Sequence, residues 1–162
     1  MRYRRYRSGD FDVLNGVEEA CFAQPFRFSR AAMRRIVGEP NTATWIAEDE
    51  DGMAGFGVVE WFASRAGRTA YIQTIEVLPE KRARGAGREL LAHIEESARE
   101  AGAPAIGLHV DAENAGAIRL YERQGYACEG RREGFYPQGR AALVYVKRLA
   151  TQSHSLCAGL LS

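Results

Sequence analysis

Cysteine, lysine and long apolar runs are scarce in this sequence. Its three cysteines, Cys21, Cys128 and Cys157, are far apart and lack metal-ligand spacing to one another or to a histidine. We therefore expect neither a disulfide framework nor a metal site. No apolar run approaches the roughly 18 residues of a membrane span, and residues 1–7 alternate tyrosine with arginine instead of forming an apolar signal segment. These absences predict a cytoplasmic protein without a membrane partner.

Charge of the two signs is nearly balanced, because 22 basic residues accompany 21 acidic ones and the formal net charge is +1. Such a chain has no overall field that would attract nucleic acid, and its arginines form no periodic stripe. We therefore expect no nucleic-acid partner. Only two of the basic residues are lysines, and one of them opens the basic segment Lys81-Arg82-Ala83-Arg84.

Length and composition are those of a folded globular chain, with 162 residues, 46% hydrophobic and 27% charged. This length fits one domain, since domains usually have roughly 100–200 residues. We expect that domain over residues 1–149. Residues 150–162 are small, polar and unpatterned, which predicts a loose tail.

Hydrophobic periodicity divides the chain into strands and helices. Three segments rich in β-branched and aromatic residues, separated by turns, predict antiparallel strands. An amphipathic helix and another strand follow Pro79, and a strand–helix–strand crossover makes the two flanking strands parallel. The sequence therefore predicts an α/β fold with a mixed sheet. The predicted strands are Met1–Arg7, Thr42–Glu48, Gly55–Ala63, Thr69–Leu78, Ala105–Val110, Tyr126–Arg132 and Ala141–Arg148, and the helices Phe11–Phe22, Ser29–Val37, one through Leu90–Ala98, and Asn114–Gln124.

Two glycines lie at the start of the central helix, in Arg82-Ala83-Arg84-Gly85-Ala86-Gly87-Arg88. Glycine lets the backbone approach a ligand closely, and the free N–H groups of a helix start attract anions. We therefore expect a phosphate or pyrophosphate here. A dinucleotide fingerprint needs glycine in place of Leu90, and a P-loop needs Lys-Ser/Thr in place of Arg88-Glu89. A tight turn with solvated arginines is the structural alternative.

A second group of polar residues precedes the next helix, in His109-Val110-Asp111-Ala112-Glu113-Asn114. Asn114 is a suitable N-cap, and Tyr121 lies two turns further along the helix. Both side chains can face the end of the preceding strand, where open α/β sheets bind ligands. A capping asparagine and a core tyrosine are the structural alternatives.

Together, these segments resemble the GNAT superfamily of acetyl-CoA-dependent N-acetyltransferases. Arg82-x-x-Gly85-x-Gly87 is similar to the pyrophosphate loop of the family, and Asn114-x-x-Ala117-x-x-Leu120-Tyr121-x-x-x-Gly125-Tyr126 is similar to its second motif. The resemblance is detailed over residues 69–126 and follows the order of elements elsewhere. It implies a mixed, mostly antiparallel sheet whose central parallel strand pair splays apart to hold acetyl-CoA, and no metal.

The resemblance also implies roles for individual residues. Loop amides would hold the pyrophosphate, and the amide of Val77 or its neighbour would polarise the thioester carbonyl. Asn114 would contact the co-substrate. Tyr121 would protonate the departing thiolate, because a phenol with a pKa near ~10 stays protonated at neutral pH. The implied co-substrate residues are Ile75, Val77, Arg82, Ala83, Arg84, Gly85, Ala86, Gly87, Arg88, Asn114 and Tyr121.

The acceptor must reach the thioester as a neutral amine, and an α-amine with a pKa near ~8 needs less help than a lysine at ~10.4. Tyr71, Glu76 and His109 are the candidate bases that strand positions place near the splay. A histidine with a pKa near ~6.5 suits proton abstraction, directly or through water. A buried histidine and a Glu76 that partners an arginine are the structural alternatives.

Three segments are further similar to protein N-terminal acetyltransferases, including the ribosomal-protein alanine type: Leu108–Tyr121, Phe135-Tyr136-Pro137 and Gln24-Pro25-Phe26. Bacterial members usually carry glutamate where His109 stands. A eukaryotic branch is similar at Tyr71-Ile72-x-Thr74 and at Leu108-His109-Val110, and its tyrosine and histidine act as a pair through water. This resemblance implies Tyr71 and His109 as the preferred bases, with Phe26 and Tyr136 flanking the incoming peptide terminus.

We therefore expect direct acetyl transfer in a ternary complex, to the α-amine of a protein N-terminus. A small-molecule amine, such as a polyamine, an antibiotic or an amino acid, is the alternative acceptor. A non-catalytic acetyl-CoA sensor is a different class of function, and the presence of Tyr121 and His109 favours catalysis over it. We expect a monomer or homodimer.

Overall fold

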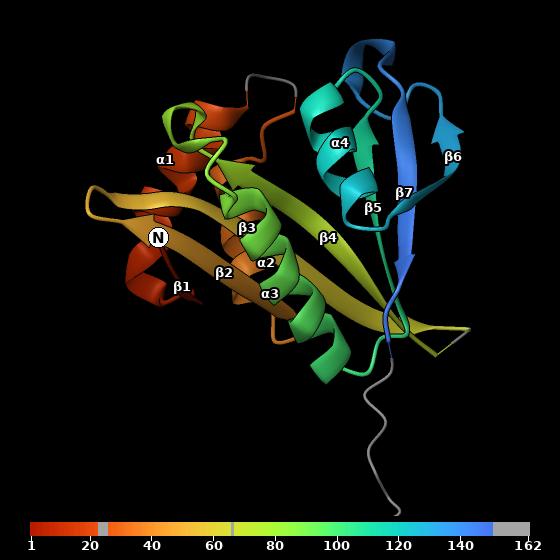
Figure 1. Cartoon of the computed structure of the whole chain (residues 1–162), viewed down its shortest axis with the longest axis horizontal. Coiled ribbons are helices and arrows are strands. Elements are labelled where there is room, and N and C mark those ends of the chain that lie inside the picture. The colour runs from red at the N-terminus through yellow and green to blue at the C-terminus, as the bar shows by residue number, and fades with distance from the viewer. Residues whose placement is uncertain (23–25, 66, 151–162) are drawn as a thin grey trace, which may run out of the picture.

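The computed structural model describes residues 1–22, 26–65 and 67–150, which form one sheet with helices on both faces (Figure 1). The strands are β1 (Arg2–Arg5), β2 (Thr42–Asp49), β3 (Gly52–Ser64), β4 (Gly67–Val77), β5 (Ala105–Asp111), β6 (Ala127–Arg132) and β7 (Ala142–Arg148). The α-helices are α1 (Phe11–Cys21), α2 (Arg30–Gly38), α3 (Ala86–Glu100) and α4 (Ala115–Arg123), and short 3-10 turns are η1 (Ser8–Asp10), η2 (Pro79–Lys81) and η3 (Pro137–Gly139).

The sheet has the strand order β1-β2-β3-β4-β5-β7-β6. Strands β4 and β5 are parallel, whereas the other neighbouring pairs are antiparallel. The predicted α/β fold with a mixed, mostly antiparallel sheet is therefore confirmed. Some strand boundaries differ from the predictions: β1 is shorter than the predicted Met1–Arg7, and β3 begins at Gly52 rather than Gly55. The last strand, β7, lies between β5 and β6, an order that was not predicted.

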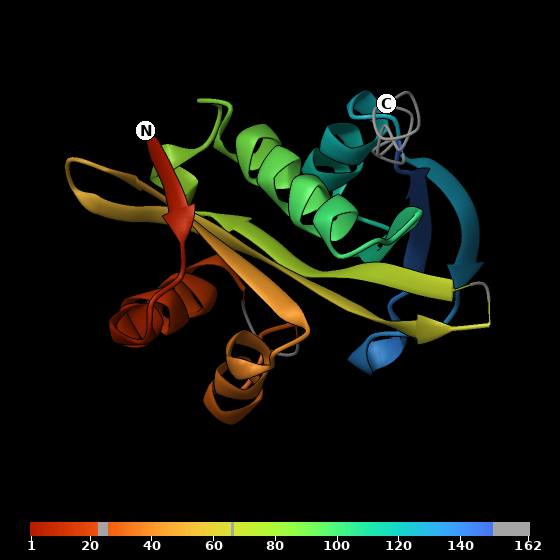
Figure 2. The same ribbon diagram turned by 90° about the horizontal axis from the view of Figure 1, so that it is seen from below.

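Helices α1 and α2 cover one face of the sheet, and α3 and α4 lie on the opposite face (Figure 2). Each face has its own hydrophobic cluster because successive strand side chains point to opposite sides. Val58 packs with Leu14 of α1 in one cluster, and its neighbour Val59 packs with Ile94 of α3 in the other. The sheet is thus buried on both faces through its central strands.

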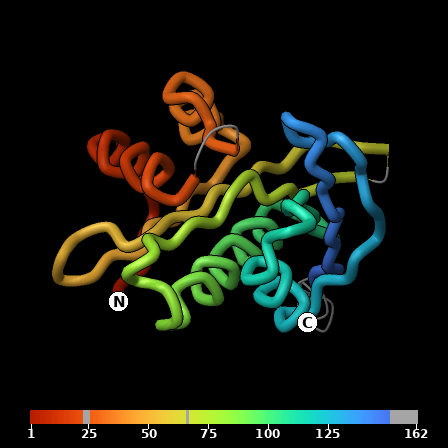
Figure 3. Tube along the Cα trace, turned by 90° about the horizontal axis from the view of Figure 1, so that it is seen from above, coloured from red at the N-terminus to blue at the C-terminus, as the bar shows by residue number. Residues whose placement is uncertain are grey.

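Strands β4 and β5 separate soon after they begin to pair. Only Ala70 opposite Ile106 and Tyr71 opposite Gly107 are in register. Beyond these pairs the two strands diverge toward their carboxyl ends (Figures 1 and 3). The predicted splay of the parallel pair is confirmed.

A β-bulge distorts β4 at the point where it leaves β5. Val58 of β3 pairs with Thr74 and Val59 pairs with Ile72, so Gln73 has no partner on β3. A bulge shifts the alternation of side chains by one position. As a result Ile72 packs in the cluster under α3, whereas Glu76, four residues later, contacts α1 on the other face.

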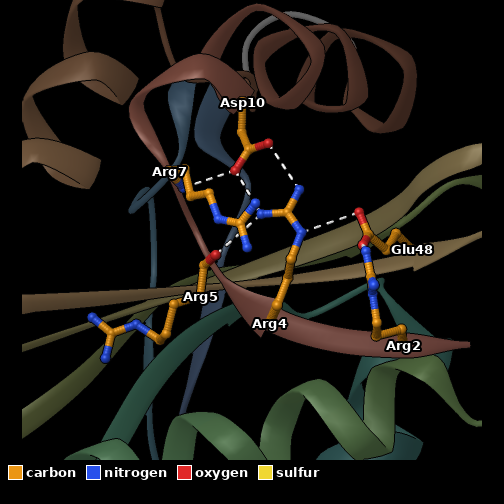
Figure 4. Close-up of polar contacts among 6 residues, drawn as sticks. All are labelled: Arg2, Arg4, Arg5, Arg7, Asp10 and Glu48. Carbon is orange, nitrogen blue, oxygen red and sulfur yellow. Dashed lines mark hydrogen bonds and ion pairs between the residues drawn. The ribbon is translucent and has the colours of Figure 1, made fainter.

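Arg4 joins the first strand to the start of α1 and to β2 (Figure 4). Its Nη1 and Nη2 each lie 2.9 Å from an oxygen of Asp10, and its Nε lies 3.1 Å from Glu48. Asp10 also accepts a hydrogen bond from the Arg7 amide at 2.7 Å. The hydrogen bonds from Arg4 lower the pKa of Asp10 below its ordinary value.

Within the described part of the chain, every helix is too short or too polar to cross a membrane. Cys21 and Cys128 are free thiols. Cys157 and the predicted tail from residue 151 onward lie outside the described residues, as do Gln24 and Pro25 of the segment Gln24-Pro25-Phe26.

Candidate active site

The loop before α3 has the backbone geometry of an anion site. Gly85 is its N-cap with φ +80°, and Ala83 also has a positive φ of 64°. The first bond of the helix runs from Glu89 N–H to Gly85 C=O, at 3.1 Å. The amides that precede Glu89 in the helix have no intrahelical acceptor, so they are free to bind an anion.

The basic side chains around this loop differ in their availability. Lys81 lies 2.8 Å from Asp49 and 2.5 Å from Asp51, so its charge is already compensated. The Arg82 Nε donates to the Val77 carbonyl at 2.9 Å, which ties the loop to the end of β4. Arg84 and Arg88 are exposed, with side-chain exposures of 59% and 62%, and can turn toward a bound phosphate.

A cavity of about 1200 Å³ extends from this loop into the splay between β4 and β5. Pockets for small molecules usually have volumes of roughly 300–1,000 Å³, so this one has room for a long ligand and a second reactant. Tyr71 is the one predicted site residue absent from the lining, and it contacts the lining through His109. The predicted residues in the lining are Phe26, Ile75, Glu76, Val77, Arg82, Ala83, Arg84, Gly85, Ala86, Gly87, Arg88, His109, Asn114, Tyr121 and Tyr136.

Tyr71 and His109 form a hydrogen bond across the base of the splay, with 2.9 Å between Oη and Nδ1. His109 also stacks on Phe135, with ring centroids 4.4 Å apart and planes at 1°. Its Nε2 is buried and has no partner among the described residues. Burial, and secondarily the charge of Arg132, lower the pKa of His109 below 6.5. The imidazole is therefore neutral at pH 7 and able to accept a proton.

Tyr121 of α4 is buried beside the cavity and packs edge-on against Tyr126, with centroids 5.5 Å apart. Burial raises its pKa above 10, and the neighbouring phenols of Tyr136 and Tyr71 raise it further. The hydroxyl thus keeps its proton throughout the neutral range. At the start of the same helix, Asn114 Oδ1 accepts the Ala117 amide at 3.2 Å, so Asn114 caps the helix and also lines the cavity.

Aromatic side chains form a cluster at the cavity, to which Phe26 and Tyr136 contribute lining surface. Phe26 and Tyr136 meet edge to face, with centroids 5.1 Å apart, and Phe135 contacts Tyr136 at 4.9 Å. The guanidinium of Arg140 lies over Phe26 and pairs with Asp111 at 2.6 Å. These contacts connect the segment after α1 with the hairpin between β6 and β7.

Glu76 lies next to a second carboxyl group that was not among the predicted site residues. Its Oε1 accepts the Thr74 hydroxyl at 2.7 Å, and Glu18 of α1 lies within hydrogen-bonding reach. Within the part of the chain that the structure describes, the hydrogen bond found for Glu76 comes from Thr74 and not from an arginine, which was the predicted alternative. The sequence contains a feature that could have indicated Glu18, because it lies at helical spacing between Leu14 and Cys21, on the face of α1 that packs inward. Phe28 and Gln73 are further lining residues that were not predicted.

The chain belongs to the acetyltransferase (GNAT) family, whose sequence pattern matches residues 13–126. Among individual proteins, it is 39% identical to streptothricin acetyltransferase of Streptomyces lavendulae over 105 residues, 64% of this chain and 54% of that protein. It is 34% identical to the ribosomal protein bS18 alanine N-acetyltransferase of Salmonella typhimurium over 88 residues, 54% of this chain and 57% of that protein.

A solved structure confirms the fold. The ribosomal-protein-S18-alanine N-acetyltransferase from Escherichia coli superposes with a TM-score of 0.80 over 96% of this chain and 97% of that one, at 22% identity. The chain spans little more than half the length of the two curated relatives named above.

Proposed function

We propose that this protein transfers an acetyl group from acetyl-CoA to a primary amine, by direct attack in a ternary complex. The observation that carries the proposal is the Tyr71–His109 hydrogen bond, which joins a neutral base to the same cavity as the anion-binding loop. Family membership supports acetyl-CoA as the co-substrate. No step of the proposed reaction needs a metal.

The loop and the splay fit the two ends of acetyl-CoA. The free amides at the start of α3, with Arg84 and Arg88 beside them, would bind the pyrophosphate. The pantetheine arm would lie along β4, where Ile75 and Val77 line the cavity and β5 no longer pairs with them. A backbone N–H there would donate to the thioester oxygen as negative charge develops on it.

Deprotonation of the acceptor would proceed through the Tyr71–His109 pair. The Tyr71 hydroxyl accepts the ammonium proton, directly or from a bridging water, and passes its own proton to Nδ1 of His109. The pKa of His109 is below 6.5, so this base is weak but fully available at neutral pH. Glu76, the third predicted base, receives a different role below.

Departure of the CoA thiolate would be assisted by Tyr121. The nitrogen–carbon bond forms as the carbon–sulfur bond breaks, and the sulfur takes up the negative charge. The acylated nitrogen then loses one proton, which balances the proton gained by the sulfur. The raised pKa of Tyr121 makes it a weak acid, so it stabilises this sulfur by hydrogen bonding as well as by proton transfer. A tyrosine that only filled the core would not need its hydroxyl.

A protein N-terminal α-amine is the acceptor class that we favour. An α-amine has a pKa near ~8, so a weak base suffices, whereas a lysine at ~10.4 would need a stronger one. The aromatic pair of Phe26 and Tyr136 would flank the first residues of the peptide. The relative that acetylates the alanine of ribosomal protein bS18 supports this class.

A small-molecule amine is the second candidate, because the relative with 39% identity is a streptothricin acetyltransferase. The two classes can be separated by one experiment. The protein is incubated with labelled acetyl-CoA and a pool of peptides with free or blocked N-termini together with small amines, and products are identified by mass. Products on free α-amines alone support our choice, and products on small amines alone contradict it. Acetyl-CoA binding without any product would indicate a sensor.

A further inference from the structure

Two buried carboxyl groups, Glu18 of α1 and Glu76 of β4, are neighbours, and Glu76 lines the cavity. The residues are 0% and 4% exposed. One oxygen of each has a donor: Glu18 Oε1 accepts the Phe28 amide at 2.7 Å, and Glu76 Oε1 accepts the Thr74 hydroxyl at 2.7 Å. The second oxygen of each is buried, and no donor within the described residues reaches it.

The two carboxyl groups are neighbours, and a hydrogen bond between them would satisfy the two buried oxygens that have no donor. Both cannot ionise in contact and out of water, because like charges repel there. With one proton between them, one carboxyl donates to the other and the pair carries a single negative charge. Among the described residues, the Cys21 thiol on α1 is a titratable neighbour of both carboxyl groups, and the guanidinium of Arg82 lies near that thiol.

We propose that Glu18 and Glu76, by sharing one proton, are positioning residues that hold the acceptor loop, residues 26–28, against β4. Glu18 fixes the Phe28 amide, while Glu76 lies between Ile75 and Val77 on the strand proposed to carry the thioester. Phe26 and Phe28 both line the cavity. The inference rests on the acetyltransferase function proposed above, although the arrangement itself is independent of the acceptor.

Loss of the shared proton would break this connection. Burial and the neighbouring Glu18 raise the pKa of Glu76 to about 10, so the proton is retained at pH 7 and lost in alkaline solution. Above that pH, two negative charges face each other between α1 and β4. The acceptor loop is then expected to separate from the strand, and the acceptor to bind more weakly.

The test compares Glu76→Ala and Glu76→Gln with the wild-type protein. Glutamine can donate its amide N–H to Glu18 at every pH, whereas alanine leaves Glu18 buried and unpaired. The first readout is the exchange protection of the Phe28 amide by NMR, which requires neither acceptor nor acetyl transfer. We expect Glu76→Ala to lower it about tenfold or more at pH 7. Glu76→Gln should keep protection at pH 7 and, unlike wild type, also at pH 10.

The second readout is kinetic, with a peptide bearing a free N-terminal alanine as the probe acceptor. Glu76→Ala should raise KM for the peptide about tenfold while kcat and the Kd of acetyl-CoA change less than about threefold. Glu76→Gln should retain the wild-type KM at pH 7. If the peptide is not acetylated at all, the proposed function fails while the exchange data still decide the pairing.

A buried carboxylate far from the acceptor loop provides the matched control. Glu95 is 6% exposed and pairs with Lys147 at 3.0 Å. Glu95→Gln should lower global stability without a selective change at Phe28. The proposal is overturned if wild type and Glu76→Gln lose Phe28 protection in parallel between pH 7 and 10. Should Glu76→Ala not fold, this comparison alone is decisive.

Discussion

The Tyr71 hydroxyl of β4 and Nδ1 of His109 on β5 lie 2.9 Å apart, directly where the two parallel strands begin to diverge. Tyr71 is in register with Gly107, the last residue of β5 that pairs with β4, and His109 stands two positions further along. The hydrogen bond therefore closes the narrow end of the splay. A proton accepted by Tyr71 at this point has a direct path to the imidazole.

His109→Ala should remove or move an ionisation from the pH profile of kcat/KM. Burial favours the neutral imidazole and lowers its pKa, so the wild-type rate should rise with pH through an ionisation below 6.5. The rate is measured with two acceptors whose amine pKa values differ. An ionisation of the enzyme stays at the same pH for both acceptors, whereas an ionisation of the substrate follows the acceptor.

His109→Ala removes the stacking contact with Phe135 as well as the base, so a second variant is needed to separate the two effects. Phe135→Leu removes the aromatic partner and keeps His109, so it should leave the low-pH ionisation in place. A rising limb that follows the acceptor and ignores His109→Ala would make His109 a structural residue. Bulk water or Tyr71 alone would then be the better candidate for the base.

Tyr121→Phe should reduce kcat more than it weakens acetyl-CoA binding. The hydroxyl is needed chiefly as the sulfur departs, and general acid catalysis usually contributes about 10²–10⁴-fold in rate. The packing against Tyr126 is retained because only the oxygen is lost. Turnover and the Kd from calorimetry are measured side by side.

Tyr126→Phe is the matched control, since it also removes one buried phenol oxygen. That hydroxyl donates to Glu95 at 3.0 Å, away from the cavity lining. The control variant should lose stability while keeping kcat. A native kcat in Tyr121→Phe would identify Tyr121 as a packing residue.

The parts of the site that the sequence predicts are those in which local pattern and chemistry coincide. Gly85 and Gly87 stand at a helix start, where glycine lets the backbone approach a ligand and the free amides can bind an anion. Asn114 follows a strand and begins a helix, and both its cap and its place in the cavity are found in the structure. The strand–helix–strand order likewise predicts the parallel pair, because the crossover leaves one direction for the second strand.

The parts that the sequence does not predict depend on long-range register. The bulge at Gln73 moves Glu76 to the face opposite Ile72, although residues four apart in a regular strand share a face. Its partner Glu18 is far away in the chain and sits in the apolar stripe of α1. Likewise, no local feature of β7 indicates that it inserts between β5 and β6.

Asp10→Asn should lower the free energy of unfolding at neutral pH. The variant should then lose less of its stability than the wild type does when the pH is lowered. Arg4 lowers the pKa of Asp10 in the folded chain below its ordinary value of 3.8. In acid the unfolded chain therefore binds a proton more readily than the folded chain. The stabilisation by the Arg4–Asp10 pair is complete above the ordinary pKa and is lost as the pH falls through the lowered one. Hydrogen bonds to charged groups contribute roughly 1.5–3 kcal/mol, and partial exposure places this pair near ~1.5 kcal/mol. Urea unfolding at pH 7 and pH 3 measures the difference.

The exposed pair of Asp12 and Arg30 provides the comparison, because the Asp12 side chain is 80% exposed. Asp12→Asn should change the free energy of unfolding far less, since solvent screens the pair. An equal loss of unfolding free energy in both variants would contradict the stabilising role assigned to the Arg4–Asp10 hydrogen bonds.

Gly85→Val should abolish acetyl-CoA binding in a chain that still folds. The residue has φ +80°, which valine rarely adopts, and it lines the cavity, where an added Cβ would meet only Arg88 Nη2, at 3.8 Å. Gly102 is the matched control, because it has φ +86°, an added Cβ there would have nothing within 4 Å, and it lies at the far end of α3. Gly102→Val should therefore carry a similar backbone strain and loss of stability while binding acetyl-CoA normally in calorimetry. If both folded variants bind alike, the loop of residues 82–88 is a turn and the pyrophosphate site lies elsewhere.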